Sequence, residues 1–447
     1  MKKYIILLSI FILFFVGILI TTRILDDESG KSDRPVVSLF GDNSASSSGN
    51  DVLNSMHGQG KELELSAETV FVDNPEGNYS AETEIIVEAK LSDDDWNIRN
   101  EAGLTNGNIA STMKECSGMY GYANLAASQR QLYAEILLVY RGQTSKVPLC
   151  STDEKMVETV STCVLLDHPE IFYAEGYSYE QYLFAGKIQK ILYSPNYTMT
   201  SEQIAQQENM IAQAVDNYLA QLPANATDYD KVKYVYEMVI LNTEYNLEAP
   251  DNQNICSVFL GGESVCLGYA KAVQYLLQQL NVEATVITGS VISGESHAWN
   301  LVKVNGQYYY LDATWGDASY TSAGGEETAL SNINYDYLCI TTQDLLQTHI
   351  IEHPISVPNC IVQIDNYYVK EGLYLTSMDT MLVENIFNTA KSQGRTCVAI
   401  RCSSSTVYKE FQMNMLDNQH IFQYLGSGTS TLAYTTNDKL YTYTFML

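Results

Sequence analysis

The spacing of apolar residues predicts helices over much of the first half of the chain. Apolar positions recur at helical spacing in residues 129–140, 154–166, 201–222 and 230–242. The last of these leads directly into a segment with mixed helical and strand-like patterns. We therefore expect residues 62–229 to be mostly helical and the chain beyond them to combine helices with sheet.

A β-hairpin is the clearest local structure in that second segment. Two runs rich in β-branched and aromatic residues, 297–304 and 307–314, flank the dipeptide Asn305-Gly306. This dipeptide is typical of a type I′ turn, because both central residues of that turn need a positive φ. With Asn305 and Gly306 in the turn, Val304 pairs with Gln307.

This register predicts which side chains share a face of the hairpin. It places Trp299 opposite Asp312 and His297 opposite Thr314, and all four on one face, since side chains alternate along a strand. His297 and Asp312 are then diagonal neighbours with Cα atoms roughly 7 Å apart, close enough for their side chains to meet.

A helix that carries Cys266 is predicted to begin shortly after Gly261-Gly262. Ser264 is a suitable N-cap, and apolar residues recur at helical spacing from Cys266 to Leu280. In the first turn, free N–H groups and the helix dipole favour a thiolate, and the Cys266 amide is placed to donate to an oxyanion. Gly268 is expected to leave room beside the thiol.

A thiol, an imidazole and a carboxylate are the parts of an activated-cysteine triad. Taken singly, each residue has an ordinary explanation: Cys266 as a packed core residue, His297 as a core or surface histidine, and Asp312 as a turn residue. Their combination, with one at a helix N-terminus and two on one face of a hairpin, favours catalysis.

The same residues resemble a known family. Val265-Cys266-x-Gly268-Tyr269-Ala270, His297-Ala298-Trp299-Asn300 and Leu311-Asp312-Ala313-Thr314-Trp315 are similar to the transglutaminase-like domain of the papain-like superfamily. The resemblance extends over residues 230–360. It implies an α+β, papain-like core with Cys266 as nucleophile, His297 as general base and acid, and Asp312 as the residue that orients the imidazole.

Other segments fit this resemblance less specifically. Asn334-Tyr335-Asp336-Tyr337 and the later His349 resemble a tail found in bacterial members, and residues 167–173, which include His168, resemble an upstream signature. We interpret His168 as a turn residue. For the second oxyanion donor the candidates are Gln253 and Tyr245.

The N-terminus predicts a membrane anchor. Lys2 and Lys3 precede residues 4–22, an uncharged apolar run of about the length that crosses a hydrocarbon core. The lysines favour an N-terminus inside, so the rest of the chain is expected to be extracytoplasmic, on the cell membrane of a bacterium. A cleaved signal peptide is the alternative. The polar residues 26–61 suit a flexible linker.

The charge balance limits the class of partner. Lys and Arg total 25 against 53 for Asp and Glu, a net charge of −28, which disfavours nucleic acid as a partner. The acidity suits basic or amine-bearing substrates, although a generally acidic extracellular composition explains it equally well. We expect peptide or protein substrates at the cell surface, and contact with the membrane only through the N-terminal helix.

The cysteines and histidines give no firm sign of a metal site. Apart from Cys266, eight of the nine cysteines remain, an even number that fits either disulfides or reduced core residues, and none forms a CxxC pair. His349-Ile350-Ile351-Glu352-His353 matches the H-x-x-E-H pattern of zinc peptidases, but Pro354 ends any helix there. We interpret this match as a coincidence and expect no metal and no organic cofactor.

The sequence therefore predicts a tethered cysteine enzyme that acts on peptide or glutamine amide bonds through a thioester. The alternative is a catalytically inactive surface module that binds peptides or cell-wall polymers. The expected organisation is an anchor at residues 1–25, a linker at 26–61, a mostly helical region at 62–229, a transglutaminase-like domain at 230–360 and an α/β accessory domain at 361–447.

Overall fold

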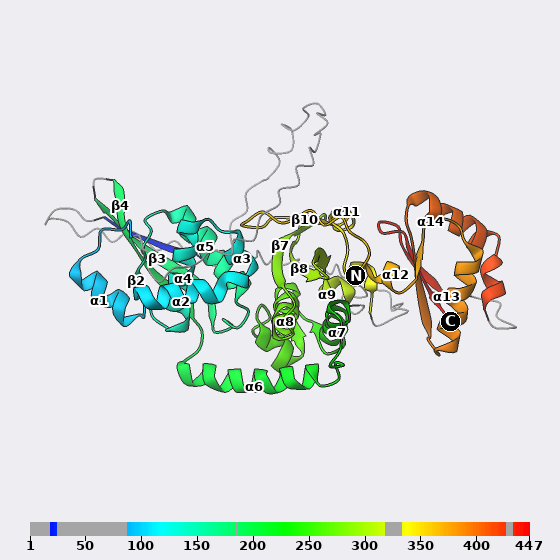
Figure 1. The fold of residues 1–447 in the computed structure, drawn as a ribbon, viewed down its shortest axis with the longest axis horizontal. Coiled ribbons are helices and arrows are strands. Elements are labelled where there is room, and N and C mark those ends of the chain that lie inside the picture. The colour runs from blue at the N-terminus through cyan, green and yellow to red at the C-terminus, as the bar shows by residue number, and fades with distance from the viewer. Residues whose placement is uncertain (1–17, 25–86, 185, 318–332, 426–431) are drawn as a thin grey trace, which may run out of the picture.

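The computed structural model describes residues 18–24, 87–184, 186–317, 333–425 and 432–447. In this part of the chain, three four-stranded sheets follow one another along the sequence. They lie side by side along the long axis of the molecule, and the long helix α6 (Ser201–Leu219) runs below the units that contain the first two (Figure 1). The fold is α+β, as expected.

The first sheet lies in the N-terminal unit and has the order β1-β3-β4-β2. Its strands are β1 (Ile18–Ile24), β2 (Val147–Pro148), β3 (Ala174–Phe184) and β4 (Lys187–Tyr197). Five helices accompany it: α1 (Asp93–Glu101), α2 (Asn106–Glu115), α3 (Tyr120–Asn124), α4 (Ala127–Arg141) and α5 (Glu154–Asp167). The helices at 129–140 and 154–166 are confirmed, whereas the β3–β4 hairpin was not predicted.

The central unit contains the segments that carry the predicted triad. Its antiparallel sheet has the order β10-β7-β8-β9, from β7 (Ala284–Val291), β8 (Ser296–Val304), β9 (Gln307–Leu311) and β10 (His349–Ile351). Helix α7 (Asp228–Leu241) precedes α8 (Cys266–Gln279), which packs on β7 and β8. Shorter elements are β5 (Glu244–Tyr245), a π-helical turn (Ser257–Gly261), β6 (Glu263–Ser264), α9 (Ala313–Gly316), η3 (Tyr335–Tyr337) and α11 (Thr342–Leu345).

The predicted hairpin register is confirmed. Val304 pairs with Gln307, and the turn residues Asn305 and Gly306 have φ values of 51° and 80°. The expected length of the second strand is wrong, because β9 ends at Leu311. Asp312 caps α9 through a hydrogen bond to the Trp315 amide, so Thr314 lies in a helix and does not pair with His297.

The C-terminal unit has the sheet order β11-β12-β14-β13. Its elements are α12 (Tyr367–Lys370), β11 (Tyr374–Leu375), α13 (Thr380–Ser392), β12 (Cys397–Cys402), α14 (Ser405–Phe411) with a π-helical extension (Gln412–Asp417), η5 (His420–Tyr424), β13 (Tyr434–Asn437) and β14 (Thr442–Met446). The unit is α/β in composition, as expected.

The predicted membrane span and linker lie mostly outside the described residues. Of the span, residues 18–22 are described and belong to β1, which pairs in parallel with β3. Among the described helices, none has both the length and the apolar character needed to cross a bilayer. The anchor and the linker at 26–61 stay predictions.

All nine cysteines are free thiols in the structure.

Candidate active site

Cys266 is the first residue of helix α8, where the helix N-terminus leaves backbone N–H groups unpaired. Its side chain is buried. The residue before it, Val265, is the N-cap and makes no side-chain hydrogen bond to the helix. Ser264 is therefore not the cap that we predicted, because its hydroxyl donates to the Asn252 carbonyl 2.9 Å away and lies 2.6 Å from the Ser257 hydroxyl.

Gly268 makes room for the loop that precedes the helix. A Cβ at this position would lie 1.9 Å from the Ser264 Oγ and 2.8 Å from the Asn252 carbonyl oxygen. The missing side chain thus allows the segment around Asn252 to pack against the first turn of α8. This differs from the predicted role of leaving space beside the thiol.

Two contacts hold α8 in place. The Asn300 amide on β8 donates to the Ala270 carbonyl at 2.8 Å, which ties the cysteine helix to the histidine strand. On the other side, the Asp167 carbonyl at the end of α5 accepts hydrogen bonds from Gln274 and Gln278. Helix α8 is therefore fixed between the sheet and the N-terminal unit.

The N-terminal unit also packs against the cluster that contains Cys266. Leu166, in the last turn of α5, belongs to the same buried cluster as Cys266 and Ala298. The residue that follows it, Asp167, accepts hydrogen bonds from the Gly121 and Tyr122 amides and from the Tyr133 hydroxyl. These bonds fix the end of α5 to α3 and α4, next to its contact with α8.

His297 and Asp312 form a buried ion pair. The His297 Nε2 lies 2.7 Å from the Asp312 Oδ2, and the two side chains are 5% and 1% exposed. The Asp312 Oδ1 accepts the Trp315 amide at 3.1 Å. Since Nε2 is used for Asp312, Nδ1 is the ring nitrogen left for the thiol.

The electrostatics of the pair favour a protonated imidazole. Burial is the largest influence on His297 and lowers its pKa, but the charge of Asp312, the hydrogen bond to it and the hydrogen bond with Cys266 together raise the pKa to about 10. Burial raises the pKa of Asp312, yet the charges and hydrogen bonds of His297 and His349 hold it well below its usual range. The structure thus brings Cys266, His297 and Asp312 together.

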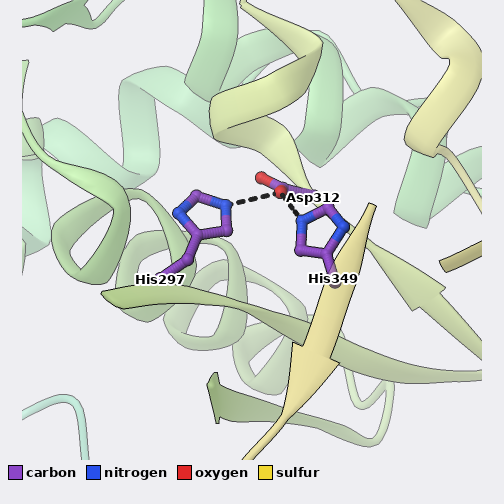
Figure 2. A group of neighbouring side chains, drawn as sticks. All are labelled: His297, Asp312 and His349. Atoms are coloured by element: carbon purple, nitrogen blue, oxygen red, sulfur yellow. Dashed lines mark hydrogen bonds and ion pairs between the residues drawn. The ribbon is translucent and has the colours of Figure 1, made fainter. Parts of the chain in front are cut away.

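A second histidine binds the same carboxylate. The His349 Nε2 lies 3.1 Å from the Asp312 Oδ2, so one oxygen sits between two imidazole rings (Figure 2). The sequence singled out His349 only as part of a resembling tail and of the H-x-x-E-H match. In the structure it begins strand β10, and a strand does not provide the helical spacing that a zinc peptidase needs.

His297, Asp312 and His349 are also the group among the described residues whose donor atoms lie close enough together for a metal ion, within 4.8 Å of one another. The 2.7 Å and 3.1 Å distances are those of direct hydrogen bonds between imidazole and carboxylate. A bound ion would have to stand between atoms that contact each other here. The arrangement is therefore explained by hydrogen bonding, and the absence of a metal stays a prediction.

The candidates for a second oxyanion donor lie in the segment between α7 and α8. Gln253 follows Asn252, whose carbonyl also accepts the Val265 amide at 3.2 Å. Tyr245 pairs with Ser264 in the short parallel ladder of β5 and β6. Both residues are thus close in the fold to the N-terminus of α8, and Gln253 remains the candidate with an amide donor.

His168 is buried, and each of its ring nitrogens faces a polar or sulfur atom, so it is more than an exposed turn residue. Its Nδ1 lies 2.7 Å from Glu170, and its Nε2 lies 4.0 Å from the Cys116 sulfur. Burial is the largest influence on this thiol and raises the pKa of Cys116 to about 12, which makes it a poor nucleophile. The cluster lies in the N-terminal unit, and within the described residues no hydrogen bond joins it to the triad.

Comparison with known proteins identifies the central segment. Residues 216–313 match the family model described as the transglutaminase-like superfamily. The kyphoscoliosis peptidase of Mus musculus is 24% identical over 125 residues, which are 24% of this chain and 19% of the mouse protein. The chain thus matches about a fifth of that relative's length.

Two solved structures show limited similarity. A TGase aligns with 34% of this chain and 50% of its own at 16% identity and a TM-score of 0.24. Menin aligns with 45% of this chain and 44% of its own at 17% identity and a TM-score of 0.22. The matched family segment contains Cys266, His297 and Asp312 and folds as a helix on an antiparallel sheet. The chain therefore contains a transglutaminase-like domain.

Proposed function

We propose that this protein is an extracytoplasmic cysteine enzyme that cleaves or transfers acyl groups at peptide or glutamine amide bonds. The observation that carries the proposal is the arrangement of His297. One side of its ring is bonded to a buried carboxylate, and the ring also interacts with the thiol at a helix N-terminus. The transglutaminase-like superfamily includes both cysteine peptidases and acyltransferases.

The chemistry proceeds in two steps. The Cys266 sulfur attacks the carbonyl carbon, and the Cys266 amide donates to the oxygen that becomes negative. His297 holds the thiol proton and passes it to the leaving nitrogen, so that the C–N bond breaks and a thioester forms. Asp312 keeps the ring oriented and stabilises its charge throughout.

The acceptor decides the outcome of the second step. Water releases a carboxylic acid, whereas a primary amine such as a lysine side chain forms a new amide. In both cases His297 removes a proton from the attacking group, and the thiol is regenerated. The triad is the same for hydrolysis and transfer, because site shape and water exclusion select the acceptor.

The experiment uses the full chain in detergent with glutamine-containing peptides and a tagged primary amine. Incorporation of the amine, release of ammonia alone, or cleavage of the chain identifies a transferase, a deamidase or a peptidase. Cys266→Ala is the blank. Peptide binding without any Cys266-dependent product would refute catalysis and support the inactive binding module.

The proposed location has a separate test. It rests on Lys2 and Lys3 before the apolar run at residues 4–22. Protease added to intact bacterial cells is expected to degrade the catalytic domain, whereas a cytoplasmic control protein survives. Protection of the domain until the cells are lysed would contradict an extracytoplasmic site.

A further inference from the structure

His349 lies on the same face of the central sheet as His297. It begins the edge strand β10 and pairs with Val291 of β7. Two residues further, Ile351 pairs with Gly289, and Gly289 pairs with His297 of β8. Paired residues share a face, and alternate residues along a strand return to that face. The two imidazoles therefore reach Asp312 from different strands of one sheet.

Both nitrogens of the His349 ring are engaged. Nε2 lies 3.1 Å from the Asp312 Oδ2, and Nδ1 lies 2.8 Å from the Thr348 Oγ1. The ring is 1% exposed and packs against Trp315 and Trp299, with ring centroids 4.8 Å and 5.0 Å away. No ring nitrogen is left to take a proton from a substrate, so a direct role as base is unavailable to His349.

The direction of the hydrogen bonds follows from the number of protons. An ionised carboxylate only accepts, so His349 Nε2 carries a proton that points at Asp312. Thr348 accepts the Tyr337 hydroxyl at 3.3 Å and has one proton of its own. It gives that proton either to His349 Nδ1 or to the Leu345 carbonyl, 3.3 Å away. In both cases His349 donates to Asp312.

We propose that His349 is a positioning residue for the triad, which holds Asp312 by a second imidazole hydrogen bond to the oxygen that binds His297. This inference rests on the proposed function. With the Trp315 amide on Oδ1 and two imidazoles on Oδ2, the carboxylate cannot rotate without breaking three bonds. The hydrogen bond from His349 also weakens the electrostatic effect of the Asp312 carboxylate on His297.

Removal of the second donor has two expected effects. Asp312 gains freedom to turn away from His297, and while it stays in place its charge acts on His297 alone. Within the described residues, the phenols of Tyr236 on α7 and Tyr337 on η3 also interact with this carboxylate, and burial together with the charge of Asp312 raises their pKa values. Neither phenol carries charge near neutral pH. We therefore attribute to His349 the weakening of the electrostatic interaction between Asp312 and His297.

The test compares two substitutions at the same position. His349→Phe keeps a buried ring without a donor, and His349→Gln keeps an N–H donor without the ring. We expect kcat with the peptide substrate to fall on the order of 10- to 100-fold in the Phe variant, with KM changed little. This is the usual effect of losing a hydrogen bond that orients a functional side chain. The Gln variant should recover most of this loss. The alkaline limb of the pH–rate profile should move to higher pH in the Phe variant.

Ile350→Ser is the matched control, because Ile350 is the next residue of β10 and its side chain is 47% exposed. It should keep the wild-type rate and pH profile. A Phe variant with wild-type kcat and an unmoved profile would overturn the inference, as would a Gln variant that is as slow as the Phe variant. A wild type without Cys266-dependent turnover would instead overturn the proposed function, and the inference with it.

Discussion

Substitution of Asp312 by Asn tests the ion pair at the centre of the site. The change removes one negative charge and nearly preserves the shape of the side chain. Without that charge, burial dominates the environment of His297 and the pKa of this imidazole falls from about 10 to below its ordinary value of 6.5. The imidazole of the variant is therefore neutral at neutral pH.

The magnitude follows from the same shift. A rise from 6.5 to about 10 corresponds, at about 1.36 kcal/mol for each pH unit, to roughly 5 kcal/mol of folding free energy. Loss of one partner of a buried pair costs about 3–5 kcal/mol, which agrees. Because the folded-state pKa is raised, this stabilisation is complete below pH 6.5 and disappears as the pH rises through 10. Between pH 7 and 9 the wild type should lose roughly 2.7 kcal/mol that Asp312→Asn does not lose.

Urea unfolding at pH 7, 8 and 9 measures this difference, with tryptophan fluorescence as the probe. Trp299 and Trp315, two of the three tryptophans, have rings about 6 Å from the His297 ring, so the signal reports on the catalytic unit. The stability gap between wild type and variant should shrink as the pH rises. Asp216→Asn, at an exposed position of α6, is the control. A gap that stays constant from pH 7 to 9 would refute the reasoning.

Three further substitutions test how the site is held. Gly268→Ala places a Cβ 1.9 Å from the Ser264 Oγ and should destabilise the protein by about 1–3 kcal/mol, measured by thermal unfolding. Asn300→Ala removes the hydrogen bond to α8 and leaves its carbonyl acceptor with one bond fewer, so stability should fall by about 1–3 kcal/mol and Cys266 should react more slowly with iodoacetamide. Gly289→Ala places a Cβ 2.0 Å from the Ile350 carbonyl oxygen, so β10 must move and peptide turnover should fall together with stability.

Gly107→Ala is a matched control for both glycine substitutions, because no atom lies within 4 Å of a Cβ at that position in α2. It should unfold at or slightly above the wild-type temperature, since alanine favours a helix over glycine. If Gly107→Ala, Gly268→Ala and Gly289→Ala lost the same amount of stability, the close contacts at Gly268 and Gly289 would not be the cause.

The local part of the site could be predicted from the sequence, because Asn305-Gly306 sets the register of one hairpin. That register predicts that His297 and Asp312 lie close together, and their side chains meet at 2.7 Å although Asp312 follows the last paired residue of β9. The position of Cys266 in the first turn of α8 is also confirmed, since the apolar spacing sets where the helix begins. The catalytic roles of the three residues stay a proposal.

The rest of the site depends on contacts between distant segments. His349 meets Asp312 through an edge strand 37 positions further along the chain, and no local spacing shows that β10 pairs with β7. The end of β9 was missed because Asp312 has two roles, as N-cap of α9 and as partner of His297. A capping aspartate next to a strand was the signal for the first role.

In the N-terminal unit, the hairpin of β3 and β4 was missed because the surrounding residues show strong helical spacing. Residues 174–197 contain alternating tyrosines, of which Tyr177 and Tyr179 are buried on one face of β3. This alternation is the pattern of a half-buried strand. In the C-terminal unit, residues 367–370 form the short helix α12, capped by the Asn366 side chain. Short helices of this kind depend on their caps more than on periodicity.

The contact between α5 and α8 limits how the transglutaminase-like domain can be separated from the N-terminal unit or exchanged. Leu166 covers part of the cluster around Cys266, and the Asp167 carbonyl holds two glutamines of α8. A fragment that starts near residue 230 would expose this apolar surface beside the thiol and leave both glutamine side chains without their acceptor. Replacement of the N-terminal unit by that of a relative would therefore alter the surroundings of the Cys266 sulfur. Substitutions at the end of α5 therefore act on the helix that carries Cys266.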